Sequence, residues 1–262
     1  MRDQVEYELR DMLQNGIIKF DDETKYNSPL VIVKKPGGKI RLVNNFIKLN
    51  EKTVNEQYLM KNPSDILSRV AGSKYATKID LQRCFFQVPL SEESQKLTGF
   101  QTPFGTFSYS TMPMGLRCAS GTAQRLLDCV LRGAHRFASS LIDDILIWSK
   151  NFSEHLEHIK FVLDRLRNAG LTVNTQKCTF GTTSLKLFGF VVEEGKITPD
   201  PEKLQPIKTW PIPRNRKQLK SFLGYTNYFR QHISHYAQIA FPLTELLSQA
   251  KPDKLQCGTS QQ

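Results

Sequence analysis

Long apolar runs are absent from this chain of 262 residues. No segment approaches the roughly 20 consecutive apolar residues of a membrane-spanning helix, and the N-terminus lacks the apolar core of a secretory signal peptide. The sequence therefore predicts a protein of the cytoplasm or nucleus that makes no membrane contact. Internal repeats and low-complexity segments are also absent, and 39% of the residues are hydrophobic, so we expect a globular fold with a substantial core.

Cysteine is scarce, and its spacing excludes a common kind of metal site. Without the close pairs that form zinc sites, we expect reduced thiols at all five positions: Cys84, Cys118, Cys129, Cys178 and Cys257. His155 and His158 lie on a predicted helix at a spacing that can bind a metal, although this spacing is more typical of a solvated helix face.

Negative charge is in short supply. Asp and Glu total 25 against 36 Lys and Arg, which gives a net charge of +11. Such an excess favours nucleic acid as a partner, because cations that neutralise phosphates release condensed counterions. Acidic residues are missing altogether from residues 203–230, a predicted helical region that would suit a phosphate backbone. Its cations are Lys203, Lys208, Arg214, Arg216, Lys217, Lys220 and Arg230.

Aromatic residues are interleaved with these cations. Such interleaving is found where the bases and sugars of nucleic acids pack. The helical spacing of Phe222, Tyr225 and Phe229 favours core packing for these three rings.

Two adjacent carboxylates, Asp143 and Asp144, stand between two strand-like apolar segments. Neighbouring carboxylates near a core repel each other and lose hydration, which a raised pKa, a basic partner or a metal ion can offset. A hairpin turn alone would also explain the pair, because Asp tolerates tight turns. A second predicted strand, from Tyr75 to Leu81, carries Asp80 near its end. Three acids can therefore converge and hold two divalent ions for phosphoryl transfer.

The remaining pattern is typical of an α+β fold. An amphipathic helix ends at Gly16, and a β-hairpin turns at Pro36-Gly37-Gly38. The cations of this hairpin can bind a triphosphate or simply keep an edge ribbon soluble; they are Lys34, Lys35, Lys39 and Arg41. The further expected elements are helices over 64–70, 119–131 and 153–170, an extended segment over 85–90, a hairpin over 98–110 and a strand over 188–192. The order in the middle of the chain is that of a split βαβ sheet with helices on one face.

These residues stand in motifs of a known family. From about Val5 to Leu247 the chain resembles the reverse transcriptase domain of Ty3/gypsy-type LTR retrotransposons. The motifs include Asn15-Gly16-Ile17-Ile18, Ser28-Pro29-Leu30-Val31, Lys78-Ile79-Asp80-Leu81, Met112-Pro113-Met114-Gly115-Leu116, Ile142-Asp143-Asp144-Ile145-Leu146, Leu187-Phe188-Gly189-Phe190 and Ser221-Phe222-Leu223-Gly224.

The resemblance implies the right-hand polymerase fold. Fingers would occupy 1–72, and 73–195 would form the palm, a split βαβ antiparallel sheet with an acidic hairpin and interleaved fingers elements. The thumb and the start of the connection would occupy 196–247, followed by a frayed tail over 248–262.

The resemblance also implies an RNA-directed DNA polymerase, a nucleotidyltransferase that extends a primer on an RNA or DNA template with deoxynucleoside triphosphates. Asp80, Asp143 and Asp144 would be its catalytic carboxylates and would hold two Mg²⁺ ions, for which Mn²⁺ can substitute. Leu81 would add a backbone carbonyl. Phe85 would exclude the ribose 2′-hydroxyl, unless it is an ordinary core aromatic.

The same resemblance assigns the substrate contacts. Lys35 and Arg41 match the positions that grip the triphosphate, and Met114-Gly115 matches the loop that frames the nascent base pair. The basic segment from Lys203 would hold the template-primer duplex by its backbone, which is a readout independent of sequence.

Several positions depart from the family pattern. Leu141 replaces the usual aromatic two residues before the paired acids, which predicts lower efficiency or fidelity. Asn45 and Ile47 replace an Asp and an Arg of the fingers, while Cys84 and Ala123 replace a glycine and a phenylalanine. We also expect a polyprotein fragment or a decayed element, since no RNase H domain follows.

Three functions remain open at this point. The first is RNA-directed DNA synthesis, which needs all three acids. The second is a decayed or truncated polymerase fold that only binds nucleic acid, as Leu141 and Asn45 would suggest. The third is a two-metal nuclease, which the lack of a further acidic cluster after Asp144 disfavours. The sequence does not predict an oligomeric state.

Overall fold

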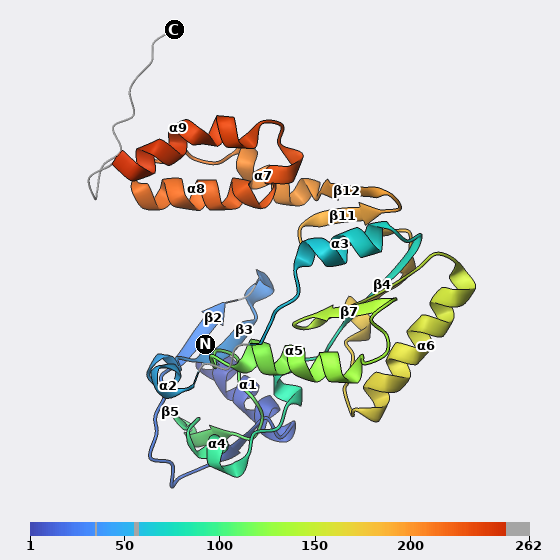
Figure 1. Ribbon diagram of the computed structural model, residues 1–262. Helices are drawn as coiled ribbons and strands as arrows, with labels where there is room; N and C mark the ends of the chain where they lie inside the picture. Colours follow the sequence, from blue (N-terminus) through green and yellow to red (C-terminus); the bar gives the residue numbers. More distant parts are fainter. Residues whose placement is uncertain (35, 55–57, 250–262) are drawn as a thin grey trace. The chain divides into compact units, whose positions relative to one another are not determined.

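The structure of the protein is a computed structural model that describes residues 1–34, 36–54 and 58–249 (Figure 1). The chain divides into two compact units, Met1–Thr183 and Ser184–Gln262. Among the described residues, no helix combines the length and apolarity needed to cross a membrane. The cysteines in the described part of the chain are free thiols, as expected: Cys84, Cys118, Cys129 and Cys178.

The first unit alternates short helices and strands. Its elements up to the centre of the chain are α1 (Arg2–Gln14), β1 (Ile18–Phe20), β2 (Leu30–Lys34), β3 (Ile40–Asn44), α2 (Ile47–Lys52), α3 (Pro63–Ala71), β4 (Tyr75–Asp80) and α4 (Glu92–Lys96). The elements that follow are β5 (Phe100–Thr102), β6 (Gly105–Tyr109), α5 (Ala119–Val130), β7 (Ala138–Leu141), β8 (Asp144–Ser149), α6 (Phe152–Asn168) and β9 (Thr179–Thr182). Single 3₁₀ turns cover Pro36–Gly38, Cys84–Gln87 and Thr175–Lys177.

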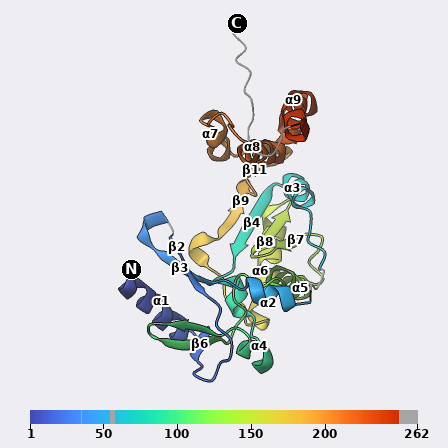
Figure 2. The same cartoon turned by 90° about the vertical axis from the view of Figure 1, so that its left-hand side faces the viewer.

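A four-stranded sheet forms the centre of this unit, in the order β7-β8-β4-β9 (Figure 2). Each neighbouring pair is antiparallel, so β4 and β7 run parallel with β8 between them. The chain passes from β4 to β7 by way of α5. This is the split βαβ arrangement that the sequence predicts.

One face of the sheet is covered by α5 and α6, which lie beside its strands in Figure 1. Ile79, Ile145 and Ile147 point to this face and are fully buried among apolar side chains of both helices. Because side chains alternate along a strand, Lys78 and Asp80 point to the opposite face, as do the residues opposite them on β8, Leu146 and Asp144. Burial of the helical face thus directs the charged residues away from the core.

A second core lies around α1 and the smaller sheets. Strands β1, β6 and β5 form one antiparallel sheet and β2 and β3 form a ribbon, so both predicted hairpins are confirmed. Apolar residues of α1 meet Phe100, Phe107 and Tyr109, all of which are at most 1% exposed. The predicted amphipathic helix that ends before Gly16 is likewise confirmed.

The second unit contains a three-stranded sheet followed by helices. Its elements are β10 (Ser184–Leu187), β11 (Phe190–Glu193), β12 (Lys196–Pro199), α7 (Pro201–Lys208), α8 (Arg216–Tyr228), a 3₁₀ turn (Arg230–His232) and α9 (Tyr236–Gln249). Asp200 caps α7 by accepting from the backbone N–H of Glu202, and Pro201 occupies the first turn. The rings of Phe222, Tyr225 and Phe229 pack with Trp210 or with each other, as their helical spacing predicts.

Three local predictions are wrong. Residues 85–90 are not extended throughout, because the left-handed backbone of Arg83 (φ 52°) turns the chain into a 3₁₀ turn over Cys84–Gln87. The strand expected from 188 begins at Phe190, because Phe188 and Gly189 both have positive φ and form a turn. His155 is fully buried rather than solvated. Most of the tail predicted to fray, 250–262, lies outside the described residues.

Candidate active site

Two strand ends bring the predicted acids together. Asp80 is the last residue of β4 and is directly opposite Asp144, the first residue of β8. Asp143 belongs to the two-residue turn between β7 and β8, and its carbonyl accepts from the Leu81 N–H at 3.4 Å. The acidic pair therefore lies at a hairpin turn, as one interpretation predicts, and the β4–β8 register brings Asp144 opposite Asp80.

The turn itself is conformationally unusual. Ile142 precedes Asp143 and has a φ of 58°. A β-branched residue in this region is strained by roughly 1–3 kcal/mol, and such strain persists only where neighbouring contacts over-determine the backbone. The backbone next to the acids is therefore held in place by the surrounding structure.

Asp144 is held in a costly environment. Its side chain is 18% exposed and pairs with the Lys78 ammonium at 2.8 Å. Burial raises the pKa of Asp144, Lys78 lowers it, and the charges of Asp143 and Asp80 raise it further. Asp80 has its own cation, Lys177, at 3.8 Å. Repulsion between the acids is thus partly balanced by two lysines.

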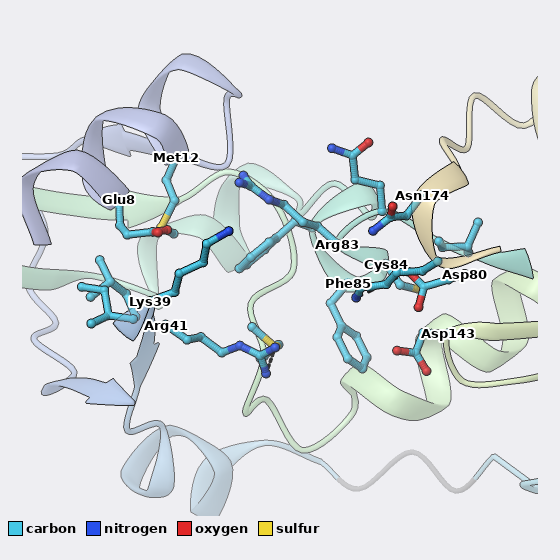
Figure 3. Close-up of a pocket in the computed structure, with 17 residues that line it drawn as sticks. Glu8, Met12, Lys39, Arg41, Asp80, Arg83, Cys84, Phe85, Asp143 and Asn174 are labelled. Carbon is cyan, nitrogen blue, oxygen red and sulfur yellow. Dashed lines mark hydrogen bonds and ion pairs between the residues drawn. The ribbon is translucent and has the colours of Figure 1, made fainter. Parts of the chain in front are cut away.

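A cavity of about 480 Å³ opens in front of Asp80 and Asp143, whereas Asp144 is not among the residues that line it (Figure 3). Asp80 and Asp143 lie at one end, while Lys39 and Arg41 project from the side of the β2–β3 ribbon. Acidic and basic groups thus face a common space. That distribution suits a substrate that carries both a metal-binding group and negative charge.

Several predicted substrate residues line this cavity. Arg41 reaches it and donates to the Met114 sulfur at 3.9 Å. Leu81 and Phe85 also line it, and the Phe85 ring lies beside Asp143 in Figure 3. Phe85 also packs against the core beneath the sheet. It therefore both lines the cavity and contributes to the core.

Two predicted substrate residues stand apart. Gly115 does not line the cavity; its carbonyl accepts from the Asn50 side chain at 2.8 Å, and its φ of 95° favours glycine. Lys35 lies outside the described residues.

Sequence reasoning missed part of the cavity wall. Glu8 and Met12 come from α1, and Arg83, Asn174 and Lys177 come from loops next to the sheet. Arg83 donates to Asp11 at 2.6 Å and so links α1 to the loop after β4. None of these positions carries a local signal, because contacts distant in sequence bring them to the site.

Cys84 lies beside the acids but offers no nucleophile. It is 9% exposed, and burial together with the charges of Asp143 and Asp80 raises the pKa of its thiol to about 12. The thiolate, the reactive form, is therefore scarce near neutral pH.

The donors fit a divalent metal ion. Carboxylate oxygens are the ligands that Mg²⁺ and Mn²⁺ prefer, and the lysine ammonium groups on Asp144 and Asp80 stand where a metal would otherwise balance the charge. Within the described part of the chain, no three His, Cys, Asp or Glu side chains are already gathered closely enough to hold an ion.

The predicted nucleic-acid residues belong to the second unit. These cations lie on α7, on α8 or just before α8: Lys203, Lys208, Arg214, Arg216, Lys217 and Lys220. Arg216 is partly buried, and the other five side chains are exposed. Cations so placed are available to contact phosphates.

Comparisons with known proteins identify the family. Residues 33–194 match the model of the reverse transcriptase (RNA-dependent DNA polymerase) family. The chain is 37% identical over 93% of its length to the Retrovirus-related Pol polyprotein from transposon 297, and 36% identical over 94% to that from transposon gypsy, both of Drosophila melanogaster. It spans about a quarter of the length of these relatives, 24% in each case.

Solved structures agree on the fold. A foamy viral protease-reverse transcriptase in complex with double-stranded DNA superposes with a TM-score of 0.91 over 98% of this chain and 45% of its own, at 24% identity. The same viral protein in complex with an RNA/DNA hybrid gives a TM-score of 0.84 over 96% of this chain and 34% of its own, also at 24% identity. The expected right-hand polymerase fold is thereby confirmed. The chain belongs to the reverse transcriptase family, in the group represented by the Pol polyproteins of Ty3/gypsy-type LTR retrotransposons.

Proposed function

We propose that this chain is an RNA-directed DNA polymerase that adds deoxynucleotides to the 3′-end of a primer. The observation that carries the proposal is the pairing of Asp80 with Asp144 across β4 and β8, with Asp143 in the adjoining turn. Asp80 and Asp143 line a cavity whose other wall supplies cations. That combination supports transfer of a nucleotidyl group, because it can hold metal ions at one end and a triphosphate at the other.

The acids hold the metal ions in this proposal. Asp80, Asp143 and Asp144 would bind two Mg²⁺, and the bound ions would lower the pKa of the primer hydroxyl and neutralise the departing pyrophosphate. Lys78 forms an ion pair with Asp144. Leu81 adds its backbone carbonyl to this end of the cavity.

The opposite wall holds the incoming nucleotide. Lys39 and Arg41 bind the triphosphate through charge-assisted hydrogen bonds, with Lys35 as a further candidate. In this proposal the Phe85 ring, which lines the cavity, excludes a 2′-hydroxyl, and Met114-Gly115 frames the nascent base pair. A Phe85→Val variant should therefore incorporate ribonucleotides more readily, as measured by the ratio of kcat/KM for dTTP and UTP.

The second unit binds the duplex in this proposal. The foamy viral relatives are described in complex with double-stranded DNA and with an RNA/DNA hybrid, and the basic surface of α7 and α8 suits the same ligands. Replacing Lys217 and Lys220 with alanine should lower the slope of log K against log salt by about 1 per lysine. We assign 1–72 to fingers, 73–195 to palm and 196–247 to thumb, and we place the activity in the cytoplasm or nucleus.

Primer extension tests the proposal directly. Incorporation of dTTP on oligo(dT)-primed poly(rA) is measured with Mg²⁺ and then Mn²⁺ for the wild-type protein and an Asp143→Asn/Asp144→Asn variant. The control, Asp164→Asn, removes a surface carboxylate that only pairs with Arg167 on α6. Activity in the wild type and the control, lost in the double variant, supports the proposal. Extension by the double variant contradicts it.

A second candidate is a fold that binds nucleic acid without catalysis. Leu141, at the end of β7, favours it, because leucine lacks the hydroxyl that the family's aromatic residue offers to the primer. Salt-dependent binding of an RNA/DNA duplex without incorporation under either metal would support this candidate. Introducing Leu141→Tyr then asks whether the missing hydroxyl is the cause.

A further inference from the structure

A buried glutamine clamps the turn that carries Asp143. Gln124 lies on α5, beside β7 in Figure 1, and its side chain is fully buried. Its Nε2 donates to the carbonyl of Ser140 at 3.1 Å and to the Ser140 hydroxyl at 3.0 Å, while its Oε1 accepts from the Ile142 N–H at 2.9 Å. One amide therefore satisfies backbone groups on both sides of Leu141.

This clamp acts where the backbone is strained. Ile142 has a φ of 58°, a conformation that costs a β-branched residue roughly 1–3 kcal/mol. The N–H that Gln124 accepts belongs to this same residue. Because Asp143 follows directly, a relaxed Ile142 would shift the Asp143 side chain relative to Asp80.

The orientation of the amide depends on a carboxylate one helical turn further on. Asp128 Oδ1 lies 3.0 Å from Gln124 Nε2, so the two N–H groups of the amide are shared among this carboxylate, the Ser140 carbonyl and the Ser140 hydroxyl. The nitrogen of the amide must face this carboxylate, and the oxygen is thereby turned to the Ile142 N–H. Asp128 does not line the cavity, and it contacts the elements around the turn through Gln124 and through the Ser140 hydroxyl, which donates to Oδ1 at 3.5 Å. The Ser140 contact is longer than an ordinary O–H···O hydrogen bond, so the amide of Gln124 is the stronger link.

Asp128 is in turn held by the segment before α3. The Lys61 ammonium contacts Oδ1 at 2.5 Å, and the Tyr58 hydroxyl donates to Oδ2 at 2.8 Å. This hydrogen bond also raises the pKa of the Tyr58 hydroxyl. The pair thus fixes both oxygens of one carboxylate from a chain segment distant in sequence.

We propose that Asp128 is a positioning residue that transmits the placement of Tyr58 and Lys61 to the catalytic turn through Gln124. The predicted effect on kcat rests on the proposed polymerase function. The predicted effect on the conformation of the turn rests on the structure alone. When Tyr58 and Lys61 are docked, Gln124 is oriented and the Ile142 N–H is held. When they leave, the amide is free to rotate and the turn relaxes.

A double-mutant cycle with a backbone readout tests the relay. Gln124→Met removes the clamp at similar size, Asp128→Ala removes its support, and the two are combined. Tyr58→Phe removes a single hydroxyl, and Asp164→Asn is the control for loss of a helix carboxylate. For each protein we would measure kcat and KM in primer extension, and hydrogen exchange of residues 141–144 and of β4 without substrate.

The relay predicts non-additive effects. Gln124→Met and Asp128→Ala should each lower kcat by about 10- to 100-fold with KM for template-primer unchanged, as misplaced catalytic groups do, and the double variant should be no worse than Gln124→Met. Exchange in 141–144 should accelerate about fivefold or more, the loss expected for one hydrogen bond, while β4 stays protected. Tyr58→Phe should give a smaller change in the same direction.

Other results would overturn the relay. Multiplicative losses in the double variant, loss of protection throughout the sheet, or wild-type exchange in 141–144 for Asp128→Ala would each show that Asp128 does not act through Gln124. A wild-type protein without polymerase activity would contradict the proposed function only. In that case the exchange data alone still decide whether the relay exists.

Discussion

The central acids should cost the protein stability, and Asp144→Asn measures the cost. The Asp144 side chain is 18% exposed, and its pKa is raised mainly by burial, with Lys78 opposing and the two neighbouring acids adding to the rise. A raised pKa means that folding favours the neutral form, which asparagine imitates. We expect the variant to be inactive yet more stable at pH 7 by about 1 kcal/mol, the usual gain when a strained functional group is removed.

The pH dependence of unfolding gives a second test of whether Asp144→Asn stabilises the protein. Folded Asp144 binds a proton more tightly than unfolded Asp144, so its stabilising neutral form is present at low pH and is lost as the pH rises through the raised pKa. The advantage of Asp144→Asn over the wild type should therefore be largest near neutral pH and should close as the pH falls below that pKa. Urea unfolding of both proteins at several pH values, from about pH 4, near the ordinary pKa of Asp, up to neutral pH, follows this difference.

A surface variant separates this effect from a general loss of charge. Asp164 is half exposed and lies 3.7 Å from Arg167, so Asp164→Asn should change the free energy of unfolding by less than about 0.5 kcal/mol. If Asp144→Asn unfolds at lower urea than the wild type at pH 7, the ion pair with Lys78 outweighs burial and repulsion. The reasoning about the site would then be refuted.

Two further predictions concern the framework of the site. His155 is fully buried and hydrogen-bonds to Thr77 and Ser149 at 2.8 Å, and its pKa is lowered by burial and by His158. The stability of the wild type should therefore decrease as the pH falls below about 6.5. In urea unfolding, His155→Gln should be about 2 kcal/mol less stable than the wild type at pH 8, and its stability should depend less on pH. A methyl group on Gly99 would overlap the Thr24 side chain and the Tyr26 carbonyl, so Gly99→Ala should lower stability by at least about 2 kcal/mol. Gly224→Ala, at a helical site with no neighbour within 4 Å, should instead raise it by about 1 kcal/mol; equal effects of the two alanines in thermal unfolding would contradict the argument.

The sequence by itself determined the features that depend on local chemistry. Periodic apolar residues specified α1, α5 and α6 within a residue or two, because helical and extended backbones place side chains at fixed intervals. Turn residues specified the ribbon at Pro36-Gly37-Gly38 and the hairpin between β5 and β6. The acids Asp80, Asp143 and Asp144 were found in the same way, since a carboxylate beside an apolar strand is conspicuous without any knowledge of its partners.

Only the tertiary structure decided which groups meet these residues. Lys78 pairs with Asp144 because of the register in which β4 and β8 are aligned. Local sequence patterns do not predict the register between two strands. Gln124 reads as one polar residue on an apolar helix face, and its role emerges only when α5 lies along β7. Arg83 was missed because its partner, Asp11, lies on α1, far from it in the sequence. Contacts between residues far apart in the chain depend on packing of the whole unit, which local propensity does not encode.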